Sequence, residues 1–234
     1  MPTELDLTLR PAEESDAAAV AEIHLSARRA AEMPPPVHPE DDVREWLADR
    51  LRSTDTVWVA EVDGVVGGYA RFTESWLDDL YVAPGVSGRG IGSALLDLVK
   101  QQRPGGFCLW VFEMNTPARD FYARRGLIEL ERTDGSANEE RAPDLKLAWP
   151  GADAVSFFRR LIDDVDEQLG DLLARRAALT HAVQVHKPDT TRDPAREAQI
   201  AAAMARRAPA LGEDRLRRIM HAIITESLDA VRRD

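Results

Sequence analysis

Apolar residues follow one rhythm in the first part of the chain and another in the second. Up to about residue 150, short alternating or continuous apolar stretches are typical of β-strands, and segments with helical spacing separate them. This order of elements predicts a mixed α/β fold. We expect strands at residues 5–9, 56–62, 65–73, 77–82, 107–112, 127–132 and 144–149, and helices at residues 15–29, 38–53 and 117–125 and from residue 91 onward.

After residue 150 the spacing becomes entirely helical. Apolar residues recur every three or four positions, with one break at Arg176. The pattern predicts a helix over residues 155–187, about 50 Å long at ~1.5 Å per residue, and then helices at residues 193–207 and 214–232. Two shorter helices cannot cover so long an apolar stripe, so we expect the long helices of two chains to bury one another in a homodimer.

The distribution of charge supports the same division. Residues 1–149 contain 27 Asp and Glu but 16 Lys and Arg, whereas residues 150–234 contain 14 of each. We therefore expect two domains, at residues 1–150 and 151–234.

Composition also limits the partners and the compartment. A net charge of −11 disfavours nucleic acids and anionic membranes as partners. The lone cysteine, Cys108, excludes an intrachain disulfide and lies in an apolar strand, where we expect a core residue. The sequence has neither an apolar run of ~20 residues nor a signal-peptide pattern. These features predict a soluble cytoplasmic protein that does not bind membranes.

A glycine-rich turn is the clearest chemical signal of the first domain. An apolar strand is followed by a turn containing Gly88 and Gly90, which opens a helix. Glycine permits positive φ angles, and the N–H groups at a helix start bind phosphate or pyrophosphate. One interpretation is a dinucleotide site in which Glu113 holds a ribose. Against it, several residues separate the strand from the first glycine of the motif, and a hairpin at Asp63-Gly64 precedes the strand.

The residues around this turn resemble the GNAT acetyltransferase superfamily over roughly residues 5–149. The resemblance implies a mixed sheet whose central strands, at residues 77–82 and 107–112, splay apart to hold acetyl-CoA. It rests on three segments in the family's order: Leu80-x-Val82-x-Pro84, then Arg89-Gly90-Ile91-Gly92 with Leu95-Leu96, then Asn115-x-x-Ala118-x-x-Phe121-Tyr122-x-x-x-Gly126.

By this resemblance, the pantetheine of acetyl-CoA pairs with the first splayed strand, and its pyrophosphate lies on the amides of the turn. Tyr122 is the expected general acid for the departing thiolate, with a packed core aromatic as the alternative. Ser87 stands where the family usually has Gln or Arg, and Asn115 is either a coenzyme contact or a helix cap. The resemblance assigns cofactor binding to Leu80, Val82, Ser87, Gly88, Arg89, Gly90, Ile91, Gly92 and Asn115.

The acceptor is an amine that the sequence does not identify. Glu74, Asp78 and Asp79 form either an acidic mouth that selects a cationic amine or a solvated charged edge. Trp76 and Trp110 either shape the pocket or belong to the core.

Arg176 is the clearest chemical signal of the second domain, because a guanidinium in an apolar stripe must meet an anion. Charged residues at matching spacings on three successive helices resemble the all-helical chorismate mutases over about residues 153–234. The pattern is Arg159, Val165-Asp166-Glu167, Arg176, Lys187, Asp193-x-x-Arg196-Glu197 and Ile223-Ile224-x-x-Ser227.

This resemblance implies a cationic cage for chorismate. Arg176 and Arg159, the latter from a partner subunit, clamp the two carboxylates, and Lys187 donates to the ether oxygen. The rearrangement to prephenate needs no acid, base, metal or cofactor, because catalysis consists of holding the reactive conformer and stabilising charge on the breaking ether oxygen. The catalytic residues are thus Arg159, Arg176, Lys187, Arg196 and Glu197, and the substrate-binding residues Asp193, Ser227 and Val231.

We therefore predict a bifunctional enzyme, a GNAT-like acetyltransferase fused to a three-helix chorismate mutase-like domain that forms an intertwined homodimer. Val231 stands where the mutases usually have Gln or Glu, so isochorismate or 4-amino-4-deoxychorismate is an alternative substrate. If the helical domain lacks catalysis, it is instead a dimerisation module or a sensor of a metabolite for the acetyltransferase.

Overall fold

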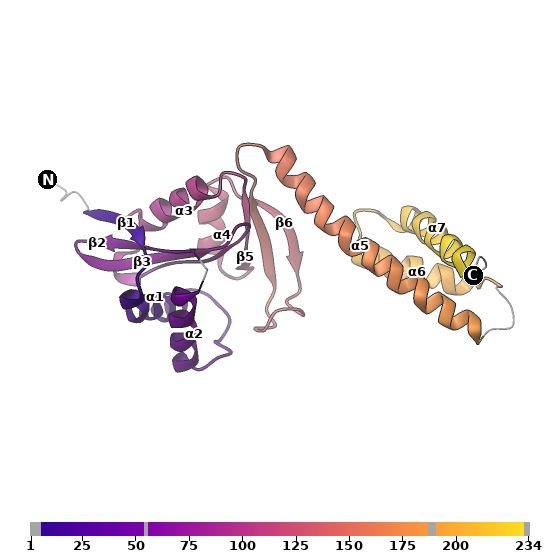
Figure 1. The fold of residues 1–234 in the computed structure, drawn as a ribbon, viewed down its shortest axis with the longest axis horizontal. Coiled ribbons are helices and arrows are strands. Elements are labelled where there is room, and N and C mark those ends of the chain that lie inside the picture. The colour runs from indigo at the N-terminus through magenta and orange to yellow at the C-terminus, as the bar shows by residue number, and fades with distance from the viewer. Residues whose placement is uncertain (1–5, 54–55, 187–190, 232–234) are drawn as a thin grey trace. The chain divides into compact units, whose positions relative to one another are not determined.

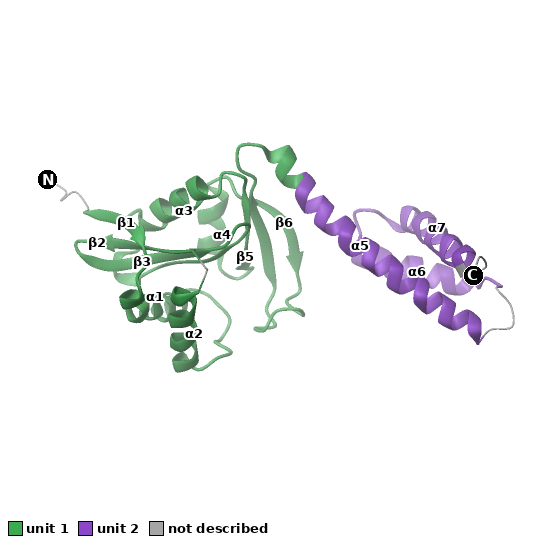
Figure 2. Ribbon diagram, in the orientation of Figure 1, with its two compact units in different colours: residues 1–158 green, residues 159–234 purple. Residues whose placement is uncertain are grey.

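The computed structural model describes residues 6–53, 56–186 and 191–231. The chain divides into two compact units, residues 1–158 and residues 159–234 (Figure 2). The boundary falls within the first turns of the longest helix, and each unit is described by itself below. The domain boundary expected between residues 150 and 151 stays a prediction.

The first unit alternates strands and helices in the predicted order (Figure 1). Leu5, expected in the first strand, lies outside the described residues. The strands are β1 (Leu7–Pro11), β2 (Thr56–Val62), β3 (Val65–Phe72), β4 (Leu77–Val82), β5 (Phe107–Phe112), β6 (Ile128–Thr133) and β7 (Asp144–Trp149), and the helices are α1 (Ala17–Ala30), α2 (Glu40–Arg52), α3 (Ile91–Gln102) and α4 (Thr116–Ala123).

The strands form two antiparallel sheets that meet at one point. Four strands pair in the order β1-β2-β3-β4, and three pair in the order β5-β7-β6. Among the described residues the sheets are joined by a parallel bridge between Trp76 and Cys108, where the Cys108 N–H donates to the Ser75 carbonyl at 2.9 Å. Beyond this bridge β4 and β5 diverge, which confirms the prediction of splayed central strands.

Helices cover both faces of the four-stranded sheet. Ala70 and Phe72 of β3 pack with Ile91 and the other buried residues of α3, whereas Tyr69 points to the opposite face and packs with α1 and α2. Gly68 permits α3 to approach, because a Cβ there would lie 3.0 Å from Ile91 Cγ2. Cys108 is buried, as predicted.

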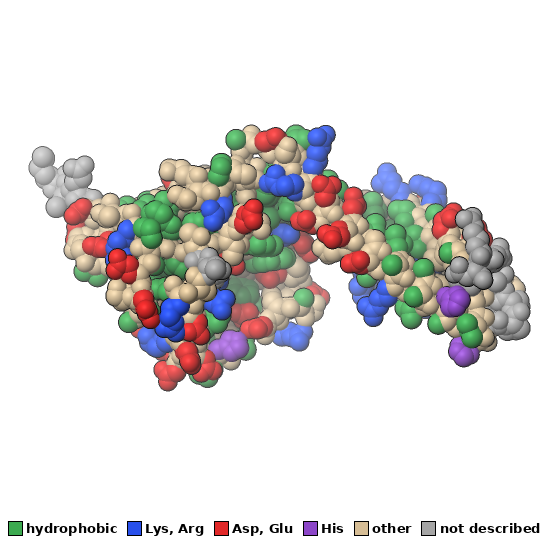
Figure 3. All heavy atoms as spheres, viewed as in Figure 1, with side chains coloured by type: hydrophobic (Ala, Val, Ile, Leu, Met, Phe, Trp, Pro, Cys, Tyr) green, Lys and Arg blue, Asp and Glu red, His purple; other side chains and the backbone are tan. Residues whose placement is uncertain are grey.

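The second unit is helical, with α5 (Ala154–Val185), α6 (Pro194–Arg207) and α7 (Glu213–Val231). Asp193 caps α6 by accepting the Arg196 N–H at 3.0 Å, and Pro194 occupies the first helical position. α6 packs against α7, whereas α5 keeps much of its apolar stripe exposed (Figure 3). The exposed apolar residues of α5 are Val155, Ile162, Val165, Leu169, Leu172, Leu173, Leu179, Val183 and Val185.

Two features are absent from the described part of the chain. None of its helices combines the length and apolar character needed to cross a membrane. Nor does it bring three or more His, Cys, Asp or Glu side chains together as a metal site would require.

Candidate functional site

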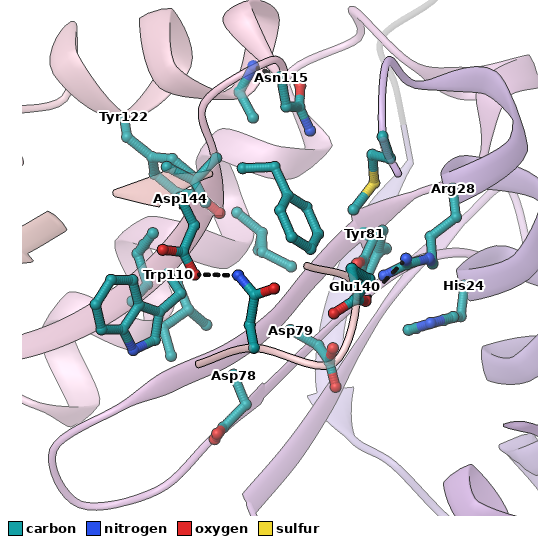
Figure 4. Close-up of a pocket in the computed structure, with 18 of the residues that line it drawn as sticks. His24, Arg28, Asp78, Asp79, Tyr81, Trp110, Asn115, Tyr122, Glu140 and Asp144 are labelled. Atoms are coloured by element: carbon teal, nitrogen blue, oxygen red, sulfur yellow. Dashed lines mark hydrogen bonds and ion pairs between the residues drawn. The ribbon is translucent and has the colours of Figure 1, made fainter. Parts of the chain in front are cut away.

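A cavity of about 520 Å³ opens where β4 and β5 diverge (Figure 4). The two strands supply much of the lining. The rest comes from α1, the segment between α1 and α2, α4, and β6 and β7 with the loop between them. Its lining includes Leu80 and Trp110 from the strands, Asn115 and Tyr122 from the α4 region, and the side chains of Asp78, Asp79, Tyr81, Asn138, Glu140 and Asp144. The side chain of Trp110 is therefore at the cavity and not in the core.

The glycine turn lies between β4 and α3. Gly88 and Gly90 have φ angles of 79° and 91°, which L-residues with a Cβ rarely adopt. No atom lies within 4 Å of a Cβ built on either residue, so the space beside the turn is open to a ligand. The free N–H groups at the start of α3 carry the positive end of the helix dipole. The turn therefore has the backbone geometry of an anion site.

Tyr122 and Asn115 lie on the α4 side of the cavity. Tyr122 is 8 % exposed, and burial raises the pKa of its phenol, so it stays protonated at neutral pH. A protonated phenol can give a proton to a thiolate. The Asn115 side-chain oxygen accepts the Ala118 N–H at 3.2 Å, so this residue is a helix cap that also lines the cavity.

The acidic residues expected at the mouth have different roles. Asp79 is buried and accepts a hydrogen bond from Arg71 Nε at 2.6 Å, so its charge is compensated. Asp78 is exposed and lines the cavity, whereas Glu74 is exposed and lies outside the lining. Glu74 therefore fits the solvated-edge interpretation.

Several cavity-wall residues escaped prediction, among them His24, Tyr81 and Arg28. His24 Nδ1 lies 2.8 Å from the Tyr69 hydroxyl, and its ring centroid is 4.6 Å from that of Tyr81. Burial lowers the pKa of His24 and raises that of Tyr81 to about 12, so both are uncharged at neutral pH. Arg28 is a charged neighbour of Tyr81 and pairs with Glu140. His24 occupies a position on the apolar side of α1, so the sequence did not distinguish it from a core residue.

In the second unit, Arg176 meets a buried hydroxyl. Its guanidinium donates to Ser227 Oγ at 2.8 Å, and Ser227 in turn donates to the Ile223 carbonyl at 2.6 Å. Two residues that the resemblance assigned to one substrate site, on α5 and α7, thus lie in contact.

Glu197 lies in a second cluster, organised by Arg192, which the sequence analysis did not single out. Arg192 donates to both carboxylate oxygens of Glu197, at 2.6 and 2.7 Å, and to Thr225 Oγ1 at 2.8 Å. A further contact joins Arg192 to His221 Nδ1 at 3.0 Å. The hydrogen bonds from Arg192 lower the pKa of Glu197, which keeps this group a carboxylate.

The remaining predicted cage residues are dispersed or undescribed. Arg159 is exposed near the start of α5, 17 positions before Arg176, which places the two Cα atoms about 25 Å apart along the helix. Arg196 is exposed on α6. Lys187 and the side chain of Val231 lie outside the described residues.

Family models match both parts of the chain. The model of the acetyltransferase (GNAT) family matches residues 20–127, and that of chorismate mutase type II matches residues 158–231. An N-acetyltransferase of Archaeoglobus fulgidus without known function is 32 % identical over 110 residues, which cover 41 % of this chain and 73 % of the relative. The chain belongs to the GNAT acetyltransferase family. It carries a chorismate mutase type II domain after the GNAT domain, as the sequence predicts.

Two more similar proteins agree with this assignment. The peptidyl-lysine N-acetyltransferase YiaC of Escherichia coli is 28 % identical over 151 residues, covering 61 % of this chain and 96 % of YiaC. The structure of yncA from Salmonella typhimurium with its cofactor acetyl-CoA superimposes with a TM-score of 0.51 at 22 % identity, covering 63 % of this chain and 95 % of yncA. The second likeness shows a shared fold.

The dinucleotide interpretation of the glycine turn is wrong. The strand before the turn is antiparallel to its neighbour, unlike the parallel strands of a dinucleotide fold. Glu113, the expected ribose ligand, is paired with Arg132.

Proposed function

We propose that the GNAT domain transfers the acetyl group of acetyl-CoA to an amine and that the helical domain converts chorismate to prephenate. The observation that carries the first activity is the cavity between β4 and β5, with the glycine turn nearby and a protonated Tyr122 in its wall. The contact between Arg176 and Ser227 carries the second. The two family models support the fusion of these activities in one chain.

In the acetyl-transfer step, the residues of the GNAT domain orient the donor and stabilise the leaving group. The backbone of Leu80 and Val82 aligns the pantetheine, and the amides of residues 88–92 bind the pyrophosphate. The amine nitrogen forms a bond to the carbonyl carbon, the carbon–sulfur bond breaks, and Tyr122 protonates the sulfur. Support for acetyl-CoA as the donor comes from the similar yncA structure, which contains it.

The acceptor has one candidate from the comparisons. YiaC acts on peptidyl lysine, and its similarity extends over nearly its whole length, so a lysine side chain in a protein is a candidate acceptor for this chain.

In the mutase step, the residues of the helical domain bind an anionic substrate in a compact conformer. Arg176 and Arg159 bind the two carboxylates, Lys187 donates to the ether oxygen, and Glu197 accepts the ring hydroxyl. Asp193 and Ser227 hold the site together, the first by capping α6 and the second by contacting Arg176.

The mutase site needs two chains. Arg159 and Arg176 lie about 25 Å apart along α5, too far for both to bind one small molecule within one chain. The exposed apolar stripe of α5 gives a second copy a surface to cover. Both features support a homodimer in which the partner subunit supplies Arg159. A cytoplasmic location stays a prediction.

The first test measures loss of chorismate absorbance without any cofactor, with the product identified by mass. Conversion to prephenate supports the mutase; with no conversion, isochorismate and 4-amino-4-deoxychorismate are assayed next, and failure of all three leaves a dimerisation or sensing module.

A mixture of Arg159→Ala and Arg176→Ala chains tests the shared site. Each variant alone is inactive, but every mixed dimer holds one intact site and half of all dimers are mixed, so exchange should restore about a quarter of the wild-type rate. No recovery, with mixed dimers confirmed by mass, contradicts the shared site.

A further inference from the structure

A second, larger cavity adjoins the one between β4 and β5. It has a volume of about 790 Å³ and lies between α1, α2, the segment that joins them and the loop of residues 134–143. Much of its wall is apolar, from Leu25, Met33, Pro34, Pro35, Pro36, Val37, Val43 and Trp46. We call it the outer cavity and the first one the inner cavity.

Four residues line both cavities and thus form the partition between them: His24, Arg28, Met33 and Glu140. Arg28 Nη2 lies 3.3 Å from Glu140 Oε1, and each side chain is only 20 % exposed (Figure 4). Arg28 comes from α1 and Glu140 from the loop between β6 and β7. The partition is therefore a largely buried ion pair between two separate segments.

Among the carboxylates of the inner cavity that are shielded from solvent, Glu140 is the one that can exchange its partner, whereas Asp78 is exposed. Asp79 is held by Arg71 at 2.6 Å. Asp144 accepts hydrogen bonds from Thr133 and Asn138, which fix the loop to the strand. The Arg28–Glu140 contact is longer, at 3.3 Å, and its two residues line both cavities.

We propose that the acetyl acceptor is a free α-amino acid with an apolar side chain, whose ammonium and carboxylate groups replace the Arg28–Glu140 ion pair. This inference rests on the proposed acetyl transfer. The ammonium pairs with Glu140, the carboxylate pairs with Arg28, and the side chain occupies the apolar outer cavity.

Charge compensation favours this class over a simple amine. A buried charge without a partner costs several kcal/mol, and an amine that takes Glu140 alone removes the carboxylate that Arg28 pairs with. A zwitterion separates Arg28 from Glu140 but gives each of them a new partner of opposite charge. His24 is uncharged beside it, since burial lowers the pKa of its imidazole, and therefore does not repel the ammonium.

The chemical step is the one proposed above. The ammonium loses one proton to solvent, and the neutral nitrogen bonds to the carbonyl carbon as the carbon–sulfur bond breaks. Tyr122 protonates the thiolate, and the second proton released by the amine nitrogen returns through solvent to the Tyr122 phenolate. The products are an N-acetyl amino acid and coenzyme A.

The test compares acceptors that differ in one group. Release of free thiol from acetyl-CoA is followed with L-leucine, L-methionine and L-phenylalanine, then with L-phenylalaninamide, 2-phenylethylamine and a lysine peptide blocked at its N-terminus. At least one of the three amino acids is expected to be acetylated, and kcat/KM should fall at least about tenfold from L-phenylalanine to its amide. Arg28→Gln should remove the preference for acid over amide, and Glu140→Gln should lower kcat/KM for every amine. The control is Arg52→Gln, on α2 outside both cavities, which pairs with Asp49 at 2.5 Å and should change nothing.

The outcomes separate this inference from the proposed function. Failure of the wild-type chain to bind acetyl-CoA in calorimetry overturns acetyl transfer itself. Acetylation of the amide as fast as the acid, or of the lysine peptide ahead of all amino acids, overturns the inference and leaves acetyl transfer standing. Binding of acetyl-CoA without acetylation of any amino acid also overturns it.

Discussion

The GNAT unit encloses its cavity within one chain, whereas the helical unit leaves the longest apolar stripe of the molecule exposed. In the first unit the sheets and helices bury two apolar clusters, and every proposed catalytic group faces one cavity. In the second, Arg159 and Arg176 of α5, the two proposed carboxylate ligands, are separated by about 25 Å. A site built on a twisted sheet can converge within one chain, but a site spread along a single helix must be completed by another helix.

The two units nevertheless share α5. Its first turn belongs to the GNAT unit, where Phe157 is 4 % exposed. A Cβ on Gly106 would lie 2.4 Å from Phe157 Cδ2, so the glycine before β5 makes room for the ring. The acetyltransferase core therefore includes residues beyond Trp149, its last strand residue.

The largest expected effect tests this sharing. Phe157→Ala should lower the free energy of unfolding of the GNAT unit by about 3–5 kcal/mol, because it leaves a cavity beside Gly106. Urea unfolding followed by loss of acetyltransferase activity measures it. Phe158→Ala is the control, since Phe158 is only half-buried and should cost less. Equal losses would mean that α5 merely begins after the GNAT core.

The next effect separates the two activities. Arg176→Ala should lower chorismate turnover by roughly 10²–10³-fold, because the cation proposed to hold a substrate carboxylate in the reactive conformer is lost. Acetyl transfer should not change, since Arg176 lies in the other unit. The exposed neighbour Arg175 supplies the control Arg175→Ala, and both rates are measured on the same preparations. A parallel loss of both activities would show that the units do not function independently.

Much of the fold could be predicted from local sequence patterns, because the elements concerned are determined by residues close together in the chain. The Asp63-Gly64 hairpin, the α3 apolar spacing and the Asp193-Pro194 helix start each depend on neighbouring residues. All three appear in the structure. The glycine turn was also predictable, because positive φ angles require glycine.

The acceptor wall could not be predicted in this way. Arg28 and Glu140 are 112 positions apart, and neither lies in a motif with its own spacing. Glu140 comes from a loop without periodicity, and His24 occupies a helix position where an apolar residue would fit equally well. Arg192 precedes the motif that begins at Asp193, but its contact with Thr225 of α7 joins residues 33 positions apart and has no local sequence pattern.

A smaller effect probes the donor site of the self-contained unit. Gly90→Ala should destabilise the fold by about 1–2 kcal/mol, because φ of 91° strains a residue with a Cβ. It should also raise KM for acetyl-CoA, since the N–H groups at the start of α3 move. Gly85→Ala is the matched control, with open space around its Cβ and no positive φ. Thermal unfolding measures the loss of stability, and steady-state kinetics measure the KM for acetyl-CoA. Equal stability and equal KM in the two variants would contradict a role for the turn geometry.

The smallest expected effect concerns the cluster of Arg192 and Glu197 in the helical unit, and it tests whether this cluster contributes to the proposed mutase site. Arg192 lowers the pKa of Glu197, so in Arg192→Gln that pKa rises toward its ordinary value and the carboxylate becomes protonated at higher pH. His221 also lowers this pKa and Asp193 raises it, and both remain in the variant. The acid limb of chorismate turnover should therefore move to higher pH, with a loss below about tenfold at neutral pH because the pair is partly exposed. Arg217→Gln breaks a comparable exposed pair with Glu213 on α7 and should leave the pH profile unchanged. An unchanged profile in Arg192→Gln as well would mean that Glu197 does not act in the mutase site as a carboxylate.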